Sequence, residues 1–534
     1  MTLTNSIPLL ISASCSGLLL HCFAFRRGEW DSVSPTLLLS YAIIAAAGSL
    51  ILSARSFFVT ASSHLVGIWL SMLFYRLFFH RLSRFPGPFA GRLSNLYVTF
   101  LSAKNLRLYE ETRRLHDKYG DYIRLGPSEL SIADPQAVKA LYSTMSPVTK
   151  GPFYTLFEPR NPLFTIRDRN AHSERRKIWD RAFSTRSLQM YEPRVLKYTL
   201  ELIDAIEQRI GTPMNMQEWF AFYSFDVMGD ITFGKAFNML SKGEPSPILG
   251  TIQTTLGIVF GYLGHLPWAF AVFKKLPIIN GKYNEFWKWV ANQLDERAAN
   301  KEAQDDVFWW LLNAHQQGQK TPQDTLDLQG DAFLSIVAGS DPSATALTNI
   351  FFHLATNRRL AQEIQNIIDQ LPPADYKSLM MLDILDGLIN ETFRLHPPAP
   401  SGTQRVTPPE GMFIGENWIP GNVIVQVPLH TVYLDDRAFD KPLEFRPERW
   451  TTHPELVRDK SVFIPFNGGP YACAGKQLAL MELRLVVAGV LRRYDFALAP
   501  SQTEESFWAQ QKDHYTLAPS PLWLQFTKRA RGVR

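Results

Sequence analysis

Apolar residues are concentrated at the start of the chain, in three long runs separated by short polar breaks. The runs cover Ile7–Phe25, Pro35–Ala54 and about Phe57–Phe79, and each is long enough to cross a bilayer as a helix. A single signal peptide would instead combine a basic start with one short apolar segment. The pattern predicts about three transmembrane helices, with buried core helices as the alternative.

Basic residues around these runs predict how they cross the membrane. Arg26 and Arg27 follow the first run, and Arg76, Arg81 and Arg84 close the third. Because basic flanking residues stay on the cytosolic side, three spans place everything after Arg84 in the cytosol and the N-terminus in the lumen. Two spans fit this charge distribution less well.

A proline-rich segment ends the apolar region. In RFPGPFAGRL, Pro86 and Pro88 fix their own backbone angles and restrict the residue before each of them. This predicts a stiff hinge over residues 84–91, between a membrane region (1–83) and a globular domain (92–534).

The globular domain has mainly helical periodicity. Leu196–Ile210 and Leu360–Leu371 show apolar positions at helical spacing, whereas strand-like alternation is confined to short pieces such as Tyr122–Leu125 and Val423–Val427. No repeat or linker-like run divides the domain. The pattern therefore predicts one mainly α domain with small β-sheets.

Composition narrows the class of protein. The chain has 534 residues, 46% of them apolar and 20% charged, which supports a large core and excludes disorder. A net charge of +5 gives no reason to expect nucleic-acid binding. Of the three cysteines, Cys15 and Cys22 lie in the first apolar run, so Cys473 has no partner in the globular domain. This excludes a disulfide framework and suits a reducing compartment.

Cys473 is the strongest chemical candidate. It lies in FNGGPYACAG, Phe466 to Gly475, directly before the helical run KQLALMELRLVVAGVL. Free N–H groups and the dipole at a helix start stabilise a thiolate, Gly469 permits a sharp turn, and Gly475 leaves room for a flat macrocycle packed on Phe466. One cysteine cannot build a zinc or iron–sulfur site, but it suffices as an axial ligand of haem iron. A nucleophilic cysteine is the alternative, although no motif indicates the histidine base it needs.

Two further motifs point in the same direction. ETFRLHPP places Glu391 and Arg394 at i, i+3 on one helical face, and FRPERW supplies Arg449. A carboxylate held between two guanidiniums forms a fixed, charge-assisted network. E-x-x-R alone is more typical of a solvated surface pair, but its order and spacing relative to the cysteine loop make the combination specific.

Together with HSERRKIWDRAF and AGSDPS, these motifs resemble the cytochrome P-450 superfamily of haem-thiolate monooxygenases, in its membrane-bound eukaryotic, fungal-type branch. The resemblance covers the whole globular domain. It implies a haem b cofactor, electrons from NADPH through a cytochrome reductase or a cytochrome b-type donor, and a lipophilic small-molecule substrate of secondary metabolism. It also implies a multi-pass protein of the endoplasmic reticulum membrane with a cytosolic catalytic domain.

The resemblance assigns roles to further residues. Cys473 would be the proximal iron ligand, and Glu391, Arg394 and Arg449 would hold the fold behind it. Basic residues would reach the haem propionates: His172 and Arg176, at i, i+4 on one helix, and Arg405. A solvated helix face is the alternative for these basic residues.

The cysteine loop departs from the family at one position. The family usually carries an arginine two residues before the cysteine, where this chain has Tyr471. A tyrosine can donate one hydrogen bond but brings no charge, so His172, Arg176 and Arg405 would have to neutralise the propionates.

The central helix departs as well. The family pattern of small residue, glycine, any residue, acid and threonine reads here as Ala338, Gly339, Ser340, Asp341 and then proline, with Ser343 following. The proline has neither hydroxyl nor N–H, so the Ala338 carbonyl loses its helical partner. A kinked helix is the simple interpretation. Alternatively, that carbonyl holds a water that passes protons together with Asp341 or Ser343.

These departures leave three functions open. The first is a monooxygenase, favoured by Asp341 and by a basic helix (Lys476, Arg484, Arg492 and Arg493) that can dock an acidic electron donor. The second is a haem-thiolate isomerase or dehydratase, which needs neither O₂ nor a reductase. The third is a haem-binding membrane protein without turnover.

The substrate site is expected in two aromatic or apolar regions. Gly151–Phe164 is rich in aromatic residues, and Thr254–Phe273 is apolar with several glycines. In the family these regions line the pocket or dip into the membrane, although aromatic stretches are more often plain core.

Overall fold

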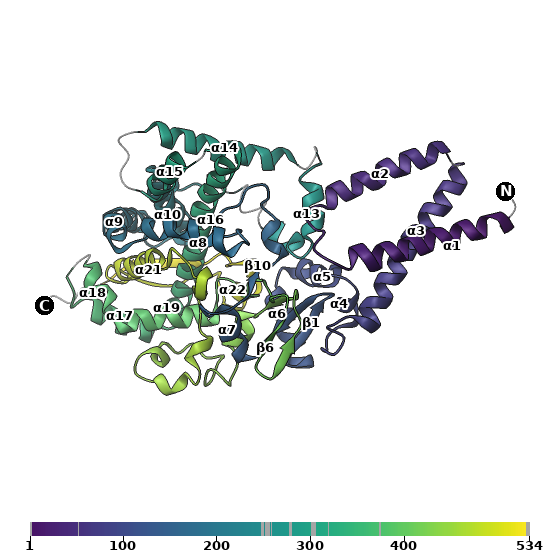
Figure 1. Cartoon of the computed structure of the whole chain (residues 1–534). Coiled ribbons are helices and arrows are strands. Elements are labelled where there is room, and N and C mark those ends of the chain that lie inside the picture. The colour runs from purple at the N-terminus through teal and green to yellow at the C-terminus, as the bar shows by residue number, and fades with distance from the viewer. Residues whose placement is uncertain are drawn as a thin grey trace.

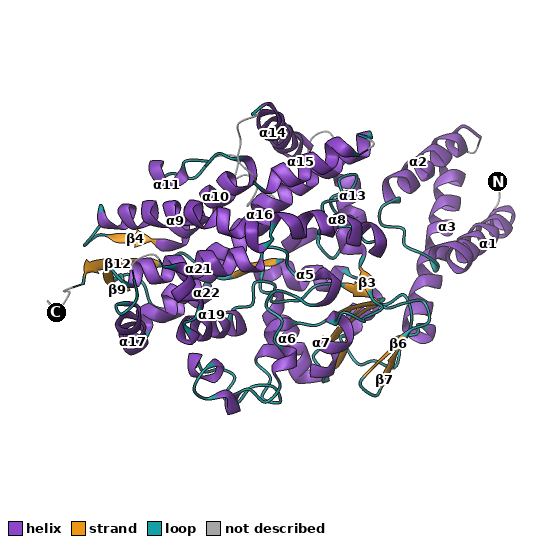
Figure 2. Cartoon of the chain, turned by 60° about the vertical axis from the view of Figure 1, so that its left-hand side comes forward, coloured by secondary structure: helices purple, strands orange, loops and turns teal. Residues whose placement is uncertain are grey.

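The computed structural model describes residues 3–51, 53–246, 250, 257, 259–276, 280–300, 306–318, 320–372 and 375–529. A largely helical globular domain carries three helices that project from one side (Figure 1). Figure 2 shows that the strands form only small sheets beside the many helices. The predicted mainly α fold with small sheets is confirmed.

Helices occur throughout the chain, including at the two segments expected to be helical, Leu196–Ile210 and Leu360–Leu371, although the observed boundaries differ. The projecting part comprises α1 (Leu3–Leu20) with η1 (His21–Phe25), α2 (Ser34–Ile51), and α3 (Ala54–Phe74) with η2 (Tyr75–Phe79). The helices of the globular domain are α4 (Phe89–Leu93), α5 (Leu96–Asn105), α6 (Leu108–Tyr119), α7 (Pro135–Tyr142), η3 (Pro152–Thr155), α8 (Arg169–Ala182), α9 (Thr185–Glu207), α10 (Met216–Phe233), α11 (Met239–Lys242), α13 (Pro267–Phe273), α14 (Asn280–Ala299), α15 (Val307–Gln317), α16 (Pro322–Thr356), α17 (Arg358–Ile368), α18 (Tyr376–Met380), α19 (Asp383–Leu395), α20 (Leu429–Tyr433), η4 (Pro447–Trp450), η5 (Pro454–Leu456), η6 (Lys460–Val462), η7 (Gly469–Tyr471), α21 (Lys476–Leu491) and α22 (Glu504–Ala509).

The strands are short and mostly antiparallel. They are β1 (Tyr122–Gly126), β2 (Glu129–Ile132), β3 (Thr149–Lys150), β4 (Pro213–Asn215), β5 (Arg405–Val406), β6 (Met412–Ile414), β7 (Asn417–Ile419), β8 (Ile424–Gln426), β9 (Tyr494–Leu498), β10 (Lys512–His514), β11 (Thr516–Ala518) and β12 (Trp523–Lys528). The largest sheet has the order β1-β2-β8-β5-β3, in which only β2 and β8 are parallel. Its far edge pairs β3 with β5, so that Lys150 lies directly opposite Arg405.

The long helix α16 runs through the middle of the globular domain (Figure 1). Thr321 and Asp324 form a capping box at its start, and Pro322 occupies its first turn. Helix α10 packs along it, with Phe220 and Phe351 4.9 Å apart between ring centroids. Helices α9 and α21 complete this core, which fixes α16 and the start of α21 relative to each other.

The three N-terminal helices have the properties of membrane spans. Each is long and apolar enough to cross a membrane, and little of each is buried. Large apolar side chains such as Ile43, Ile44, Trp69 and Leu70 are exposed. The alternative of buried core helices is therefore wrong for these segments, because the globular domain does not cover them.

Polar residues inside these helices pair with one another. His64 of α3 contacts the Ser16 hydroxyl through Nδ1 (2.8 Å) and the Tyr41 hydroxyl through Nε2 (3.2 Å). Gly17 and Gly67 let α1 and α3 approach closely, because a Cβ on either would lie 2.1 Å from a carbonyl oxygen of the other helix. His64 thus links all three helices and does not prevent α3 from spanning a membrane.

The loop between α1 and α2 rests against the globular domain. Arg167 binds the Glu29 carboxylate with both terminal nitrogens (2.6 and 2.8 Å). Asp31 accepts a hydrogen bond from the Trp268 backbone N–H (3.2 Å), and the Ser34 hydroxyl donates to the Trp268 carbonyl oxygen (2.9 Å). These contacts place the loop on the same side of the helices as the globular domain.

Candidate active site

Cys473 lies in a tight loop between η7 and α21. Its backbone N–H donates to the Phe466 carbonyl oxygen at 2.9 Å, which closes the loop. Gly469 makes the sharp turn with φ of +62°, and a Cβ there would lie 2.6 Å from the Ser143 carbonyl oxygen. The position therefore requires glycine for two separate reasons.

Cys473 is accessible although many protein groups surround it. The residue is exposed, yet burial among protein groups raises the pKa of its thiol. The backbone N–H of Gly475, the Arg176 guanidinium and Lys476 oppose that rise. The start of α21 therefore stabilises the thiolate, as expected. Burial has the larger effect on the pKa, so the thiol is favoured unless a cation binds the sulfur.

The surroundings of the thiol fit a flat prosthetic group. A Cβ on Gly475 would contact only Phe183, at an ordinary 3.8 Å, so protein packing does not explain this glycine. Phe466 packs edge-on against Phe393, with ring centroids 5.3 Å apart. Because a bare backbone position beside an accessible thiol leaves room for a macrocycle, these residues could hold a haem group.

His172 and Arg176 of α8 both reach the cysteine loop. Arg176 donates to the Ala472 carbonyl oxygen and binds Asp180 at 2.7 Å. His172 is buried edge-on against the Tyr471 ring, 4.8 Å between centroids. Burial, followed by nearby cations, lowers the pKa of His172 to about 3. Without an anion beside it, the neutral form of His172 is favoured, and this form still offers one N–H donor.

Arg405 and Tyr471 lie together next to His172. Arg405 is 1% exposed and donates to the Tyr154 hydroxyl at 3.2 Å, while its Nε has no hydrogen-bond acceptor among the described residues. The Tyr471 hydroxyl is also buried without a partner there. Lys150 joins them, with its ammonium 4.8 Å from the Tyr471 ring centroid. The sequence did not single out Lys150, because only the β3–β5 pairing brings it here.

Asp341 of α16 lines an internal cavity of about 370 Å³. Ala338, one turn earlier, is exposed to the same cavity although it lies in the middle of a buried helix. The helix continues through Pro342, which cannot donate a hydrogen bond to the Ala338 carbonyl oxygen. The Ala338 carbonyl and the Asp341 carboxylate, which were predicted to act together, are therefore on the same side of α16.

Gly339 and Ser343 do not belong to this lining. A Cβ on Gly339 would lie 2.5 Å from Met228, so the glycine allows α10 to pack against α16. The Ser343 hydroxyl donates to the Gly339 carbonyl oxygen at 3.2 Å and lies beside Glu482 of α21. Both residues therefore face neighbouring helices, and of the three predicted catalytic residues only Asp341 lines the cavity.

Glu482 is a buried acid that sequence analysis missed. Neither of its carboxyl oxygens has a hydrogen-bond partner among the described residues. Burial raises the pKa of Glu482 to about 8, and the neighbouring Ser343 hydroxyl offsets this only in part. The side chain is therefore protonated at neutral pH, which lets an apolar helix interface accommodate it.

The cavity combines expected and unexpected residues. Phe157, Phe164, Gly257 and Phe260 come from the two regions expected to form the substrate site; residues 251–256 and 258 lie outside the described part. The β10–β11 hairpin closes the cavity, and α10 adds Gln217 and Ala221. The hairpin residues of the lining are His514, Tyr515, Thr516, Leu517 and Ala518, and Pro519 directly follows the hairpin. No local signal marks the hairpin, because its position depends on its contact with α16.

Glu391 lies between two arginines, all three fully buried. Arg394 donates to both its oxygens (3.0 and 2.8 Å), and Arg449 donates to Oε1 at 3.0 Å. The Trp450 indole and the Arg446 backbone N–H fill the remaining acceptor positions. Arg394 also donates to the Tyr433, Pro442 and Glu444 carbonyl oxygens, which ties α19 to the irregular segment before the cysteine loop.

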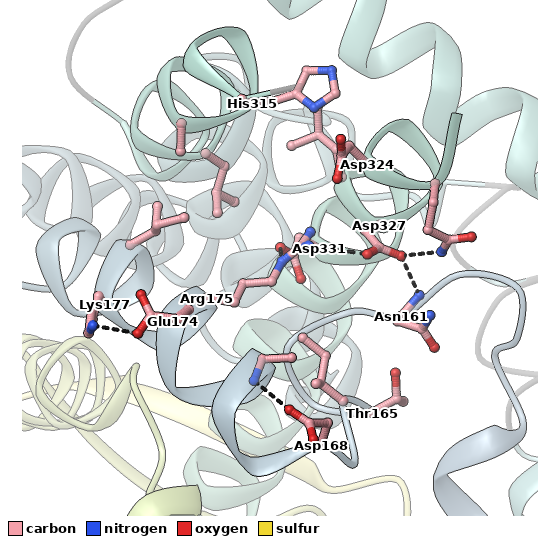
Figure 3. A pocket seen from close by; sticks show the side chains of 18 of the residues that line it. Asn161, Thr165, Asp168, Glu174, Arg175, Lys177, His315, Asp324, Asp327 and Asp331 are labelled. Atoms are coloured by element: carbon pink, nitrogen blue, oxygen red, sulfur yellow. Dashed lines mark hydrogen bonds and ion pairs between the residues drawn. The ribbon is translucent and has the colours of Figure 1, made fainter. Parts of the chain in front are cut away.

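A larger pocket of about 990 Å³ lies elsewhere, between α8, α15 and the start of α16. In Figure 3, Arg175 reaches from α8 toward Asp331 and Asp327 of α16. Its Nε lies 2.7 Å from Asp331, and its Nη1 lies 3.4 Å from Asp327. Because these charges are paired within the pocket, the Arg175 contacts serve to position α8, which carries His172 and Arg176.

The expected basic docking helix is only partly exposed. Arg484 is buried and binds Asp386 at 2.6 Å, and Arg492 donates to the carbonyl oxygens of Ile368 and Leu371 at the end of α17. Lys476 is exposed. Two of the four basic residues therefore hold neighbouring helices, and Lys476 and Arg493 are the exposed ones.

Comparisons with known proteins identify the family. The cytochrome P-450 family model matches residues 86–526, and the chain therefore belongs to the cytochrome P-450 family. It is 49% identical to cytochrome P-450 monooxygenase orf5 of Eupenicillium brefeldianum over 87% of this chain and 95% of that protein. It is 44% identical to cytochrome P-450 monooxygenase FCK2 of Fusarium pseudograminearum, over 96% of each chain. At 32% identity it also matches tryprostatin B 6-hydroxylase of Neosartorya fischeri, over 97% of this chain. The protein is an oxidoreductase of the monooxygenase type, and the family implies a haem-thiolate cofactor, a redox partner and a lipophilic substrate.

Proposed function

We propose that Cys473 is the thiolate ligand of haem iron, in an enzyme that inserts one oxygen atom of O₂ into a lipophilic small molecule of secondary metabolism. The observation that carries this proposal is the accessible Cys473 thiol at the start of α21, beside the bare backbone of Gly475. When bound, the haem supplies the activation of O₂. The mostly apolar cavity of about 370 Å³ is of a size that suits a small organic substrate.

The residues around Cys473 would have separate roles in binding the haem and holding the loop. Arg176 and Arg405 would bind the propionates, with His172 and Tyr471 as hydrogen-bond donors. Glu391, Arg394 and Arg449 would keep the cysteine loop in place. Electrons would come from NADPH through a cytochrome reductase, with a cytochrome b-type protein as a second donor.

Substrate binding can be measured directly. Soret shifts on titrating purified protein with terpenoids, indole alkaloids and polyketides would identify the substrate.

Asp341 would move protons into the cavity, with a water on the Ala338 carbonyl in place of the missing threonine hydroxyl. Asp341→Asn is expected to slow product formation by about 100-fold, because general acid–base groups typically contribute at least this much. Substrate binding and the haem spectrum should change little. The measurement compares product formed with NADPH oxidised and peroxide released, using a compound that shifts the Soret band.

Ser343→Ala is the matched control on the same helix, and it should leave turnover nearly unchanged because Ser343 faces Glu482. Full activity of Asp341→Asn would refute the proton-relay role. Product formed without reductase and without O₂ would replace the monooxygenase proposal with the isomerase or dehydratase. Haem binding without turnover of any compound would favour a binding protein.

We further propose a multi-pass protein of the endoplasmic reticulum membrane, with α1, α2 and α3 all spanning and the globular domain in the cytosol. The contacts of Glu29 and Asp31 with the globular domain support this arrangement, since they keep the α1–α2 loop on its side of the bilayer. Three spans then leave the N-terminus in the lumen.

Glycosylation mapping tests this topology. An Asn-x-Thr acceptor added before Ile7, or in the turn between α2 and α3 near Ser53, should be glycosylated in microsomes. The same acceptor placed between Arg27 and Val33 should remain unmodified, because that loop faces the cytosol. Modification of the α1–α2 loop, or an unmodified N-terminus together with an unmodified turn, would contradict three spans.

A further inference from the structure

Two buried cations lie directly opposite each other at the edge of the largest sheet. Lys150 of β3 and Arg405 of β5 are cross-strand partners, and they are 3% and 1% exposed. Like charges in this arrangement destabilise a strand pair, and a buried charge is costly without a counter-charge. Among the described residues, no carboxylate forms an ion pair with either side chain.

Aromatic rings and carbonyl groups satisfy these cations only in part. The Lys150 ammonium donates to the Leu163 carbonyl oxygen at 3.1 Å, which uses one of its three N–H groups. It lies 4.8 Å from the Tyr471 ring centroid, and the Arg405 guanidinium lies 5.0 Å from the same ring. Cation–π contacts contribute modest energy but bring no negative charge. The pair therefore lacks an anion.

The uncompensated charge borders the cysteine loop. Tyr471, whose ring both cations contact, is two residues before Cys473, and its buried hydroxyl has no partner among the described residues. Burial, followed by Arg405 and Arg176, lowers the pKa of Lys150, so the ammonium itself is disfavoured until an anion binds. A carboxylate entering here would meet Lys150, Arg405 and the Tyr471 hydroxyl together.

We infer that Lys150 binds a haem propionate and supplies the positive charge that the family's arginine at the position of Tyr471 would otherwise bring. The positive charge would then come from β3 instead of the cysteine loop, and Lys150 and Arg405 both lie over the Tyr471 ring. This inference rests on the proposed haem-thiolate function, and it assigns a cofactor-binding role to a residue that no motif marks.

Haem retention tests the inference without relying on activity. Full-length Lys150→Met should lose haem to excess apomyoglobin at least 10-fold faster than the wild type. The Lys150→Met/Tyr471→Arg double variant should return to a rate near that of the wild type, because the charge is restored from the loop. Lys150→Arg should also retain haem.

Lys274→Met is the matched control. Lys274 is likewise a largely buried lysine that donates to loop carbonyl oxygens, those of Leu156 and Glu158 (2.9 and 2.7 Å), but it does not contact Tyr471. It should lose haem at the wild-type rate. Far-UV circular dichroism of each variant separates haem loss from misfolding.

Unchanged haem retention in Lys150→Met would overturn the inference. Faster loss that Tyr471→Arg does not correct would also overturn it, since Lys150 would then act by packing alone. Neither result affects the proposed function, which fails separately if the wild type lacks the thiolate spectrum.

Discussion

Cys473→Ser is expected to abolish the strongly red-shifted Soret band of the ferrous, CO-bound protein, together with all monooxygenase activity. A serine oxygen cannot replace the soft, electron-donating thiolate on iron. The measurement is the reduced-plus-CO difference spectrum of purified full-length protein.

Cys15→Ser and Cys22→Ser serve as controls for this substitution. Both residues lie in the first apolar segment, in α1 and η1, far along the chain from the cysteine loop, so both variants should keep the wild-type spectrum. If Cys473→Ser keeps the red-shifted band, Cys473 is not the ligand, and the site must lie elsewhere.

Glu391→Gln is expected to destabilise the globular domain by about 3–5 kcal/mol, because removing one member of a buried ionic network leaves the others uncompensated. Arg394 and Arg449 are both fully buried against this carboxylate, and glutamine supplies only one acceptor oxygen and no charge. The measurement is the free energy of unfolding in urea, with haem content recorded in parallel.

Glu174→Gln is the matched control on an ion pair of similar length. Glu174 binds Lys177 at 2.7 Å, but its side chain is 73% exposed. Exposed pairs contribute about 0–1 kcal/mol, so this variant should be close to the wild type. Equal stability of the two variants would show that the Glu391 network does not hold the fold.

The N-terminal helices, the cysteine loop and their order along the chain could be predicted from the sequence. The apolar runs predicted α1, α2 and α3 to within a few residues, and FNGGPYACAG predicted a turn followed by a helix. These features depend on local backbone rules and on periodicity, which act over neighbouring residues. Glu391 and Arg394 share a helical face for the same reason, since they are one turn apart.

The direction in which a residue of a buried helix faces was harder to predict from the sequence. Gly339 and Ser343 belong to a family motif, yet packing against Met228 and Glu482 turns both away from the cavity. Arg484 and Arg492 looked like a basic surface, but helices α19 and α17 supply their partners. A single sequence does not show which face of a buried helix meets which neighbour, because every face of such a helix is covered.

By itself, the sequence determined the mainly α fold, the three N-terminal apolar helices and the single candidate thiol, because each has a local pattern. Only the tertiary structure decided the charge balance around Cys473. Lys150 and Arg405 are far apart in the chain, and the β3–β5 pairing puts them opposite each other. The hairpin carrying His514 closes the cavity through its contact with α16. Such long-range contacts depend on how the whole core packs, which no short stretch of residues encodes.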